Sequence, residues 1–327
     1  MPLAAARVAV CGPASWNHLI VLDRLPDPVP HMQFARGDLH TVGGTSAGKA
    51  LHLADLGVDV TLHAFLGADD EGRLVSAALE RAGVRVEAYA SERTERHANL
   101  MTQAGERVSL YLATPSAASV DALERIGAAV AAADVAVVDL SAAGVAIVES
   151  RLAGAGGAPI WTDLHDYDGS AEFHEPFLRA ADVVFMNDDA TDDPWALMQS
   201  CLDRGPRLAV CTIGARGAIA LAASGERATV AAQPVTVADT NGAGDAFFAG
   251  FLAASLAGAD LNGCLESGAR QAVIALSSDT CIQRSSEAER RASPARFGDD
   301  CRLRRGVVDP DPLGSHDDDG EALVERA

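Results

Sequence analysis

Basic charge and aromatic residues are scarce in this sequence, and each shortage excludes a class of function. The 327 residues carry 26 basic and 46 acidic side chains, a net charge of -20, and only 5% of them are aromatic. A nucleic-acid-binding protein needs a basic face to neutralise phosphates, and an anionic membrane surface repels a chain of this charge. We therefore expect neither nucleic acid nor a membrane among the partners.

Lysine and cysteine are also rare. Lys49 is the single lysine of the chain, so any mechanism that needs a lysine has one candidate. The six cysteines are scattered without a CxxC pair, which is typical of small buried residues in a reducing compartment and not of a zinc site or a disulfide framework. The beginning of the chain lacks the basic segment of a secretory signal, and acidic residues interrupt the longest apolar region, 126–148. These features predict a cytoplasmic protein.

Apolar residues are plentiful, at 48% of the chain, and can fill a large core. Short β-branched runs recur between alanine-rich stretches, and they are apolar without alternation, as in strands covered on both faces. This pattern predicts an α/β fold, a three-layer α/β/α sandwich with a mainly parallel, Rossmann-like sheet. The expected strands are 7–11, 58–65, 135–139, 159–163, 183–186 and 207–212.

Two segments, 18–42 and 96–113, alternate polar and apolar residues instead. Alternation indicates antiparallel strands with one solvated face. We expect these segments to form a small β lid, with strands from about 17–42 and 95–113. The same pattern also suits two exposed hairpins without a role.

The end of the chain has a different composition. After Gln283 large apolar residues are few and charged residues are many. Such a segment cannot bury enough apolar surface to fold. The sequence therefore predicts one folded domain over 1–283 and a charged, flexible tail over 284–327.

The first of two glycine-rich stretches, GGTSAGKA (43–50), nearly matches a P-loop. The glycines and Lys49 have the P-loop spacing, but Ala50 stands where a Ser or Thr hydroxyl must hold magnesium. The run before it, 38–42, is too polar for the buried strand that a P-loop follows, although 135–139 would suit a Walker B strand. The P-loop hypothesis is therefore not favoured.

The second stretch, DTNGAGD (239–245), precedes a strongly apolar helix. Unpaired backbone N–H groups and the positive end of the helix dipole make such a helix start suitable for an anion. Gly242 and Gly244 have no Cβ, so a phosphate can approach the main chain closely. More often, a glycine-rich turn before a helix only marks the point where the helix begins. The negative charge of Asp245 would then only interact favourably with the helix dipole.

In the functional interpretation, Asp245 faces an acceptor hydroxyl in phosphoryl transfer. A carboxylate is too weak a base to deprotonate an alcohol in advance. The transition state of phosphoryl transfer is loose and the proton leaves late, so a carboxylate at hydrogen-bonding distance is sufficient.

Together the two stretches resemble the signatures of the ribokinase-like, PfkB-type carbohydrate kinases. DTNGAGDAFFAGF is similar to the family's C-terminal signature, and GGTSAGKALHLADLG followed by GADDEGRLVSAALERAGV is similar to its N-terminal signature. The motifs occur in the family's order and at its spacing, and the similarity runs from about Val8 to about Ser278.

The resemblance implies a phosphotransferase that uses ATP and Mg²⁺ to phosphorylate a hydroxyl of a sugar or sugar-like alcohol. It implies that Asp245 is the catalytic base and that the anion hole is the backbone of Gly242, Ala243 and Gly244. The implied nucleotide-binding residues are Asn187, Thr212, Gly214, Gly217 and Thr240. The implied substrate-binding residues are Asn17, Gly43, Gly44, Gly48 and Asp163. A loop that in many members holds a monovalent cation such as K⁺ corresponds to Asp239 and Asn241.

Several positions depart from the family pattern. Ala190 replaces the Glu of a motif tied to magnesium and phosphate, so Asp188 or Asp189 would have to compensate. Asn17 stands where relatives of ribokinase usually carry Asp, and Gly48 where ribokinase carries Asn. We therefore do not expect the substrate to bind as ribose binds ribokinase.

Alternatives remain open. The chain could be a nucleoside kinase of the same fold, or a degenerate member that binds a sugar or nucleotide without turnover. Asp163 and His165 follow a buried strand and either contact the substrate or have a structural role.

As part of this family signature, Lys49 is not a P-loop lysine and is expected on the surface of its helix. Because lid strands in this family can pair between subunits, a homodimer through the lid is a further expectation.

Overall fold

The computed structural model describes residues 6–102, 105–154, 157–236 and 240–277. The larger of its two sheets has nine strands, which are β1 (Arg7–Cys11), β4 (Asp59–Gly67), β5 (Arg85–Ser91), β8 (Val135–Val138), β9 (Ile160–Asp163), β10 (Val183–Asn187), β11 (Leu208–Thr212), β12 (Ala218–Ala222) and β13 (Arg227–Val230). The predicted start of the tail lies outside the described residues.

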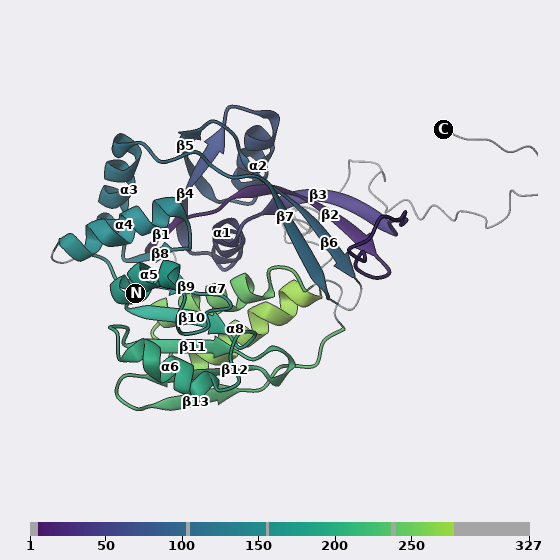
Figure 1. Cartoon of the computed structure of the whole chain (residues 1–327). Coiled ribbons are helices and arrows are strands. Elements are labelled where there is room, and N and C mark those ends of the chain that lie inside the picture. The colour runs from purple at the N-terminus through teal and green to yellow at the C-terminus, as the bar shows by residue number, and fades with distance from the viewer. Residues whose placement is uncertain (1–5, 103–104, 155–156, 237–239, 278–327) are drawn as a thin grey trace, which may run out of the picture. The chain divides into compact units, whose positions relative to one another are not determined.

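The strand order of this sheet is β13-β12-β11-β10-β9-β8-β1-β4-β5 (Figure 1). Neighbours from β11 to β5 are parallel, while β12 and β13 add antiparallel pairs at one edge. All six strands expected from the sequence are present, so the mainly parallel sheet is confirmed. The edge strands β5 and β13, and β12 beside β13, were not expected; β5, for example, exposes most of its residues and has no continuous apolar run.

Helices cover both faces of the large sheet. They are α1 (Thr45–Asp55), α2 (Asp70–Arg81), α3 (Val120–Ala132), α4 (Ala142–Ala153), α5 (Glu175–Ala180), α6 (Pro194–Leu202), α7 (Ala243–Leu256) and α8 (Leu261–Leu276). Within the described ranges, no helix is both long and apolar enough to cross a lipid bilayer.

Two separate hydrophobic cores show the three layers. Successive side chains of a strand point to opposite faces of the sheet. Val183 and Phe185 of β10 accordingly pack in the core that includes α1, α2, α7 and α8. Val184 and Met186 of the same strand pack with α3, α4, α5 and α6. The α/β/α sandwich predicted from the apolar runs is therefore confirmed.

The lid is a second sheet of four strands, β2 (Ser15–Leu22), β3 (Gly37–Gly43), β6 (Glu95–Thr102) and β7 (Arg107–Ala113), in the order β3-β2-β6-β7 (Figure 1). The outer pairs are antiparallel as expected, but the central pair, β2 with β6, is parallel. Alternation along a strand predicts its faces and not its direction. The direction follows from the large sheet, because β2 follows β1 and β6 follows β5, and both of these strands run the same way.

The cysteines behave as small apolar residues where the structure describes them. Cys11, Cys201, Cys211 and Cys264 are buried and form no disulfide. Burial raises the pKa of each of these thiols, which keeps them protonated and unreactive. Cys281 and Cys301 lie outside the described residues.

Candidate active site

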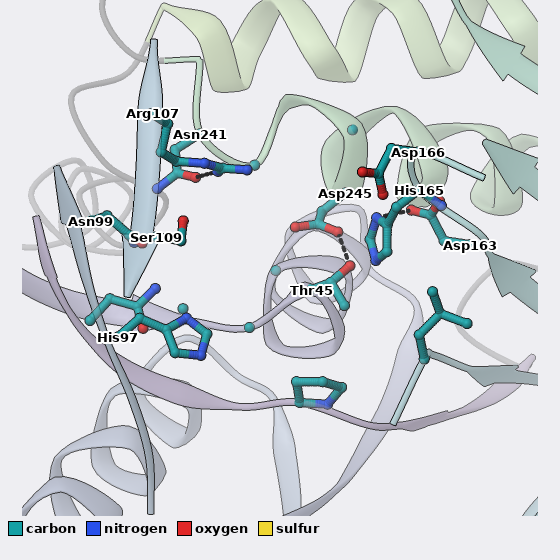
Figure 2. A pocket seen from close by; sticks show the side chains of 18 of the residues that line it. Thr45, His97, Asn99, Arg107, Ser109, Asp163, His165, Asp166, Asn241 and Asp245 are labelled. Atoms are coloured by element: carbon teal, nitrogen blue, oxygen red, sulfur yellow. Dashed lines mark hydrogen bonds and ion pairs between the residues drawn. The ribbon is translucent and has the colours of Figure 1, made fainter. Parts of the chain in front are cut away.

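A cleft of about 790 Å³ lies where the parallel strands of the large sheet end and the lid begins. Asp163, Asn187 and Thr212 line it from the ends of β9, β10 and β11. Ser109 lines it from the lid (Figure 2), and so does Asn17 of β2. The carboxyl ends of parallel strands are where open α/β sheets bind ligands. The structure thus places most of the residues singled out in the sequence in one cavity.

The start of α7 opens into this cleft. Gly242, just before the helix, has φ of 75°, a left-handed conformation that favours glycine. Gly242 and Gly244 both line the cleft, and a Cβ at Gly244 would meet no atom within 4 Å. No side chain caps this helix start. Its first backbone N–H groups therefore have no side-chain cap, and their use as an anion site stays a prediction.

Asp245, in the first turn of α7, points into the cleft (Figure 2). Its side chain is 17% exposed, and its Oδ1 accepts a hydrogen bond of 2.5 Å from the hydroxyl of Thr45. Burial raises the pKa of Asp245, whereas Lys49 and the Thr45 hydrogen bond act in the opposite direction. The carboxylate is thus held in place, partly desolvated and accessible from the cleft.

The expected surface position of Lys49 is wrong. The lysine is fully buried, and its Nζ lies 2.9 Å from Asp139, 3.3 Å from Asp163 and 3.4 Å from Asp245. Lys49 lies on the side of α1 that α7 covers. An alanine-rich helix could have kept one face exposed, but this helix turns its only lysine inward. These carboxylates raise the pKa of Lys49 although burial alone would lower it.

Asp139, which follows β8, is used inside the protein. Its carboxylate accepts hydrogen bonds from Ser46 (2.6 Å) and Lys49 (2.9 Å) and is completely buried. The sequence suggested 135–139 as a Walker B strand, but the glycine stretch before α1 follows β3 of the lid and not a strand of the large sheet. The P-loop arrangement is absent from the residues that the structure describes here.

Asp163 and His165 form the neighbouring wall of the cleft (Figure 2). The backbone N–H of His165 donates to Asp163 Oδ1 over 3.0 Å, and its ring nitrogen lies 3.7 Å from Oδ2. Burial alone would raise the pKa of Asp163, but His165 and Lys49 bring it down to about 2. Within the described ranges His165 is the one residue other than glycine with positive φ, 53°, a strained conformation that is common at functional sites.

The glycines of the first stretch allow close packing. A Cβ at Gly43 would lie 2.0 Å from the side chain of Asn17, and one at Gly44 would lie 2.4 Å from the carbonyl oxygen of Pro13. A Cβ at Gly48 would lie 2.6 Å from Oδ2 of Asp245. Asn17 itself is buried in the cleft wall and accepts a hydrogen bond from Ser15. Gly43, Gly44 and Gly48 also line the cleft, as the substrate interpretation requires.

The residues predicted to bind nucleotide divide into two groups. Asn187, Thr212 and Thr240 line the cleft, whereas Gly214 and Gly217 are not among its lining residues. Gly217 has a local reason to be glycine, because its φ is 104° and a Cβ there would lie 1.9 Å from the carbonyl oxygen of Val230. A nucleotide contact at the two glycines remains a prediction.

Near Asn187 and Asn241, some charged side chains bind other side chains of the protein, and one aspartate does not pair with the neighbouring arginine. Arg216 pairs with Asp188, so Asp189, which lines the cleft, is the aspartate left to face a ligand there. Arg107 of the lid donates a hydrogen bond of 3.1 Å to Asn241 Oδ1 (Figure 2). Asp239 lies outside the described residues, so the monovalent-cation loop remains a prediction.

The sequence interpretation missed the polar face of the lid. The cleft is lined from β6 and β7 by Glu95, His97, Asn99, Arg107, Ser109 and Tyr111. Within each strand these residues are two positions apart, so they lie on the same face of the lid sheet. The alternation that predicted the lid therefore already separated this set of residues from those of the other face. It did not show which of the two faces turns inward.

A second, mainly apolar cavity of about 630 Å³ adjoins the cleft. Both cavities are lined by Pro13, Glu95, Tyr111 and Leu140. Beyond these shared residues, the second cavity is bounded by apolar side chains of α3 and α4, among them Leu123, Ile126 and Ile147. The cleft that contains Asp245 therefore has an apolar cavity as its neighbour.

Three comparisons relate this geometry to known proteins. A model of the pfkB family carbohydrate kinases matches residues 35–288. The acarbose 7(IV)-phosphotransferase of Actinoplanes sp. is 35% identical over 272 residues, which cover 80% of this chain and 89% of the relative. The nucleoside kinase of Methanothermobacter thermautotrophicus is 27% identical over 264 residues, or 77% of this chain and 84% of the relative. The solved structure of the microbiome-derived acarbose kinase Mak1 has a TM-score of 0.74 at 26% identity, covering 86% of this chain and 98% of the other.

Proposed function

Because the chain belongs to the pfkB family of carbohydrate kinases, we propose that Asp245 is the base with which it transfers the terminal phosphoryl group of ATP to a carbohydrate hydroxyl. The observation that carries this proposal is the position of Asp245, a largely buried carboxylate at the edge of the cleft beside the uncapped start of α7. One side of that corner offers backbone N–H groups for a phosphate, and the other offers a proton acceptor. Both are needed at the same point in phosphoryl transfer.

The chemistry follows from these positions. The acceptor hydroxyl donates a hydrogen bond to Asp245, and its oxygen forms a bond to the γ-phosphorus as the bond from that phosphorus to the leaving oxygen of ADP breaks. The hydroxyl proton passes to the carboxylate late in the step. Backbone N–H groups of Gly242, Ala243 and Gly244 stabilise the negative charge on the moving phosphoryl group, a contribution of about 3 kcal/mol per donor in other enzymes. The lid excludes water that would otherwise accept the phosphoryl group.

Magnesium fits the donor set beside the phosphate corner. Asn187 and Asp189 both line the cleft, and their side chains carry the oxygen atoms that Mg²⁺ prefers. The ion is usually held by one or two protein carboxylates together with substrate phosphates. In this proposal Asp189 compensates for the Glu that Ala190 replaces. When bound, the ion would neutralise charge on the phosphates. A monovalent cation has weaker support, because Arg107 donates to the oxygen of Asn241.

A sugar or sugar-like alcohol is the acceptor that the cleft suits best. Residues with amide, imidazole and hydroxyl side chains line the cleft from the lid, among them Asn17, His97, Asn99 and Ser109. Such groups can both donate to and accept from the hydroxyls of a sugar. The adjoining cavity gives room for an acceptor longer than one ring. We therefore propose an acceptor of the kind that the two acarbose kinases phosphorylate.

A nucleoside is the second candidate, and the apolar cavity is the observation that favours it. A base could lie among apolar side chains of α3 and α4 while its sugar remains near Asp245.

A sensor that binds without turnover is less consistent with the accessible Asp245. In either kinase reading the protein would act in the cytoplasm, where ATP is available.

A homodimer through the lid has one supporting feature. Strand β7 lies at an edge of the small sheet, and its outward positions expose Val108 (40%), Leu110 (47%) and Leu112 (54%). Apolar residues on an edge strand favour pairing with a second chain. We propose this face as the dimer contact.

Asp245→Asn tests the base. Turnover should fall by about three orders of magnitude, because the amide keeps the shape but cannot take the proton. ATP affinity, measured by calorimetry, should stay within a few fold. The assay is ADP release with Mg²⁺ and a panel of mono- and oligosaccharides, acarbose and nucleosides. A variant that keeps most of the wild-type rate would disprove the assignment, and a wild type that binds ligands but phosphorylates none would favour the sensor.

A further inference from the structure

The floor of the cleft contains a buried group of four charged side chains that the proposed reaction does not yet explain. Lys49 of α1 is surrounded by Asp139 after β8, Asp163 at the end of β9 and Asp245 of α7. The lysine and Asp139 are fully buried, and the other two carboxylates are 12% and 17% exposed. Burying one cation with three carboxylates is costly unless each group is hydrogen-bonded.

The ammonium of Lys49 has a partner for each of its three protons. Its Nζ lies 2.5 Å from Thr45 Oγ1, 2.9 Å from Asp139 Oδ1 and 3.3 Å from Asp163 Oδ2. Below it the ring of Phe248, which is also fully buried, lies 5.0 Å away at its centroid. The position and orientation of the ammonium are therefore determined from several sides.

Thr45 connects this ammonium to the proposed base. A hydroxyl has one proton to donate. Because Lys49 donates to Thr45 Oγ1, the Thr45 proton is directed to Asp245 Oδ1, at 2.5 Å. Lys49 and Thr45 thus both act on Oδ1, which leaves Oδ2 for the acceptor. Gly48, one turn along α1, leaves the space that this Oδ2 occupies.

We propose that Lys49 is a positioning residue for Asp245, which it aims through Thr45 and keeps ionised among two other carboxylates. The inference rests on the proposed function, since it assumes that Asp245 is the base. Asp139 and Asp163 each place a second negative charge near Asp245, and like charges favour protonation. A protonated Asp245 cannot accept the acceptor's proton. Lys49 supplies the positive charge at 3.4 Å from Oδ1 that opposes this effect.

The pH profile separates this role from a structural one. The titratable groups that interact with the cluster from outside it are His165, beside Asp163 and Asp245, and the buried thiol of Cys11, beside Asp139. In wild type, activity should fall as the pH drops through the pKa of Asp245, which burial already raises. Lys49 has the largest effect among the groups that lower the pKa of Asp245 against burial, ahead of the Thr45 hydrogen bond and His165. Without Lys49, the acidic limb of kcat/KM should therefore move to higher pH.

Lys49→Met is the first test, because methionine fills the same volume without charge. We expect kcat/KM at neutral pH to fall at least 100-fold, the acidic limb to rise by at least one pH unit, and the affinity for ATP to change less than threefold. Arg81→Met, which removes a cation from the exposed end of α2, is the control and should keep both rate and profile. An unchanged acidic limb in folded Lys49→Met would overturn the proposal.

A double variant addresses loss of stability. Lys49→Met with Asp139→Asn removes one charge of each sign and should regain the thermal midpoint that the single variant loses. The proposal expects its acidic limb to stay displaced and its kcat to remain at least tenfold below wild type. Recovery of both the midpoint and the wild-type profile would show that Lys49 only balances buried charge, and would reject the positioning role.

The single lysine permits a direct readout without turnover. Protein grown with ¹⁵N-lysine has one side-chain nitrogen signal, that of Lys49. We expect a slowly exchanging ammonium whose chemical shift changes clearly in Asp245→Asn and not in Arg81→Met. A signal that does not respond to Asp245→Asn overturns the coupling. Because this measurement needs no acceptor, it holds even where the panel of acceptors shows no kinase activity, which would instead refute the proposed function.

Discussion

Two glycine-rich stretches begin two helices that pack side by side, and they use glycine for opposite reasons. Before α1, a Cβ on Gly43 or Gly44 would collide with Asn17 or with the main chain at Pro13. At the start of α7, a Cβ on Gly244 would meet nothing within 4 Å. Neither helix has a side-chain cap. Glycine in the first stretch lets other parts of the protein pack closely against the main chain. Glycine in the second stretch leaves space beside the main chain for a ligand.

This difference shows why a motif match alone is a weak guide to a phosphate site. Both stretches have glycines at the start of a helix, and the first even carries a lysine at the P-loop position. The start of α1 is occupied by the protein's own lid, and its lysine binds the protein's own carboxylates. Of these two helix starts, only that of α7 leaves room for a Cβ at its glycine, Gly244. Room at the glycine, and not glycine content, is the observation that supports the proposed anion site at α7.

Gly48→Ala should have the largest effect among substitutions that compare the two stretches. The new Cβ would lie 2.6 Å from Oδ2 and 3.2 Å from Cβ of Asp245, so the carboxylate would have to move. A base displaced by about 1 Å loses about 100-fold in rate. We expect kcat to fall by about that factor while ATP affinity stays nearly constant, measured by ADP release and calorimetry. Gly127→Ala on α3, where a Cβ meets nothing within 4 Å, should leave kcat unchanged. Equal rates for both variants would contradict the packing interpretation.

Gly44→Ala should lower stability more than activity. Gly44 has φ of 91° and a Cβ there would lie 2.4 Å from Pro13, so both strain and overpacking oppose alanine. We expect the free energy of unfolding to fall by about 2 kcal/mol. Gly57→Ala has a similar φ of 78° with open space and should cost about 1 kcal/mol. The measurement is urea denaturation of both variants, and a difference near zero would mean that the contact with Pro13 is unimportant.

Gly244→Ala should have the smallest effect on stability, and in the opposite direction. Alanine inside a helix is more favourable than glycine by about 0.5 to 1 kcal/mol, and the site has room for it. The same methyl group would occupy the approach of the phosphate. We expect a slightly higher thermal midpoint together with a KM for ATP raised several fold. If ATP binding were unchanged, the phosphate would have to sit elsewhere along α7.

Much of the fold could be predicted because its signals are local. Apolar runs such as 135–139 and 183–186 predicted buried parallel strands, and the start of α7 followed from Gly242 and Gly244. Alternation along 96–113 predicted the lid. These patterns depend on neighbouring residues, and burial on one or two faces leaves a clear trace in them.

The charge cluster could not be predicted because its parts are distant in the chain. Lys49 is followed by alanine and leucine, which is equally consistent with an exposed or a buried lysine. The lysine can be buried because Asp139, Asp163 and Asp245, which come from three other parts of the chain, surround its ammonium group. The parallel pairing of β2 with β6 was missed for a similar reason, since it is set by the direction of the large sheet and not by either strand.

The burial of Lys49 has a practical consequence for handling the protein. Its only side-chain amine is inaccessible while the fold is intact. Acylating dyes, aldehyde crosslinkers and amine-coupling surfaces should therefore leave the native side chains unmodified and react at Lys49 only after unfolding. The yield of lysine acylation would then report directly how much of a preparation is denatured.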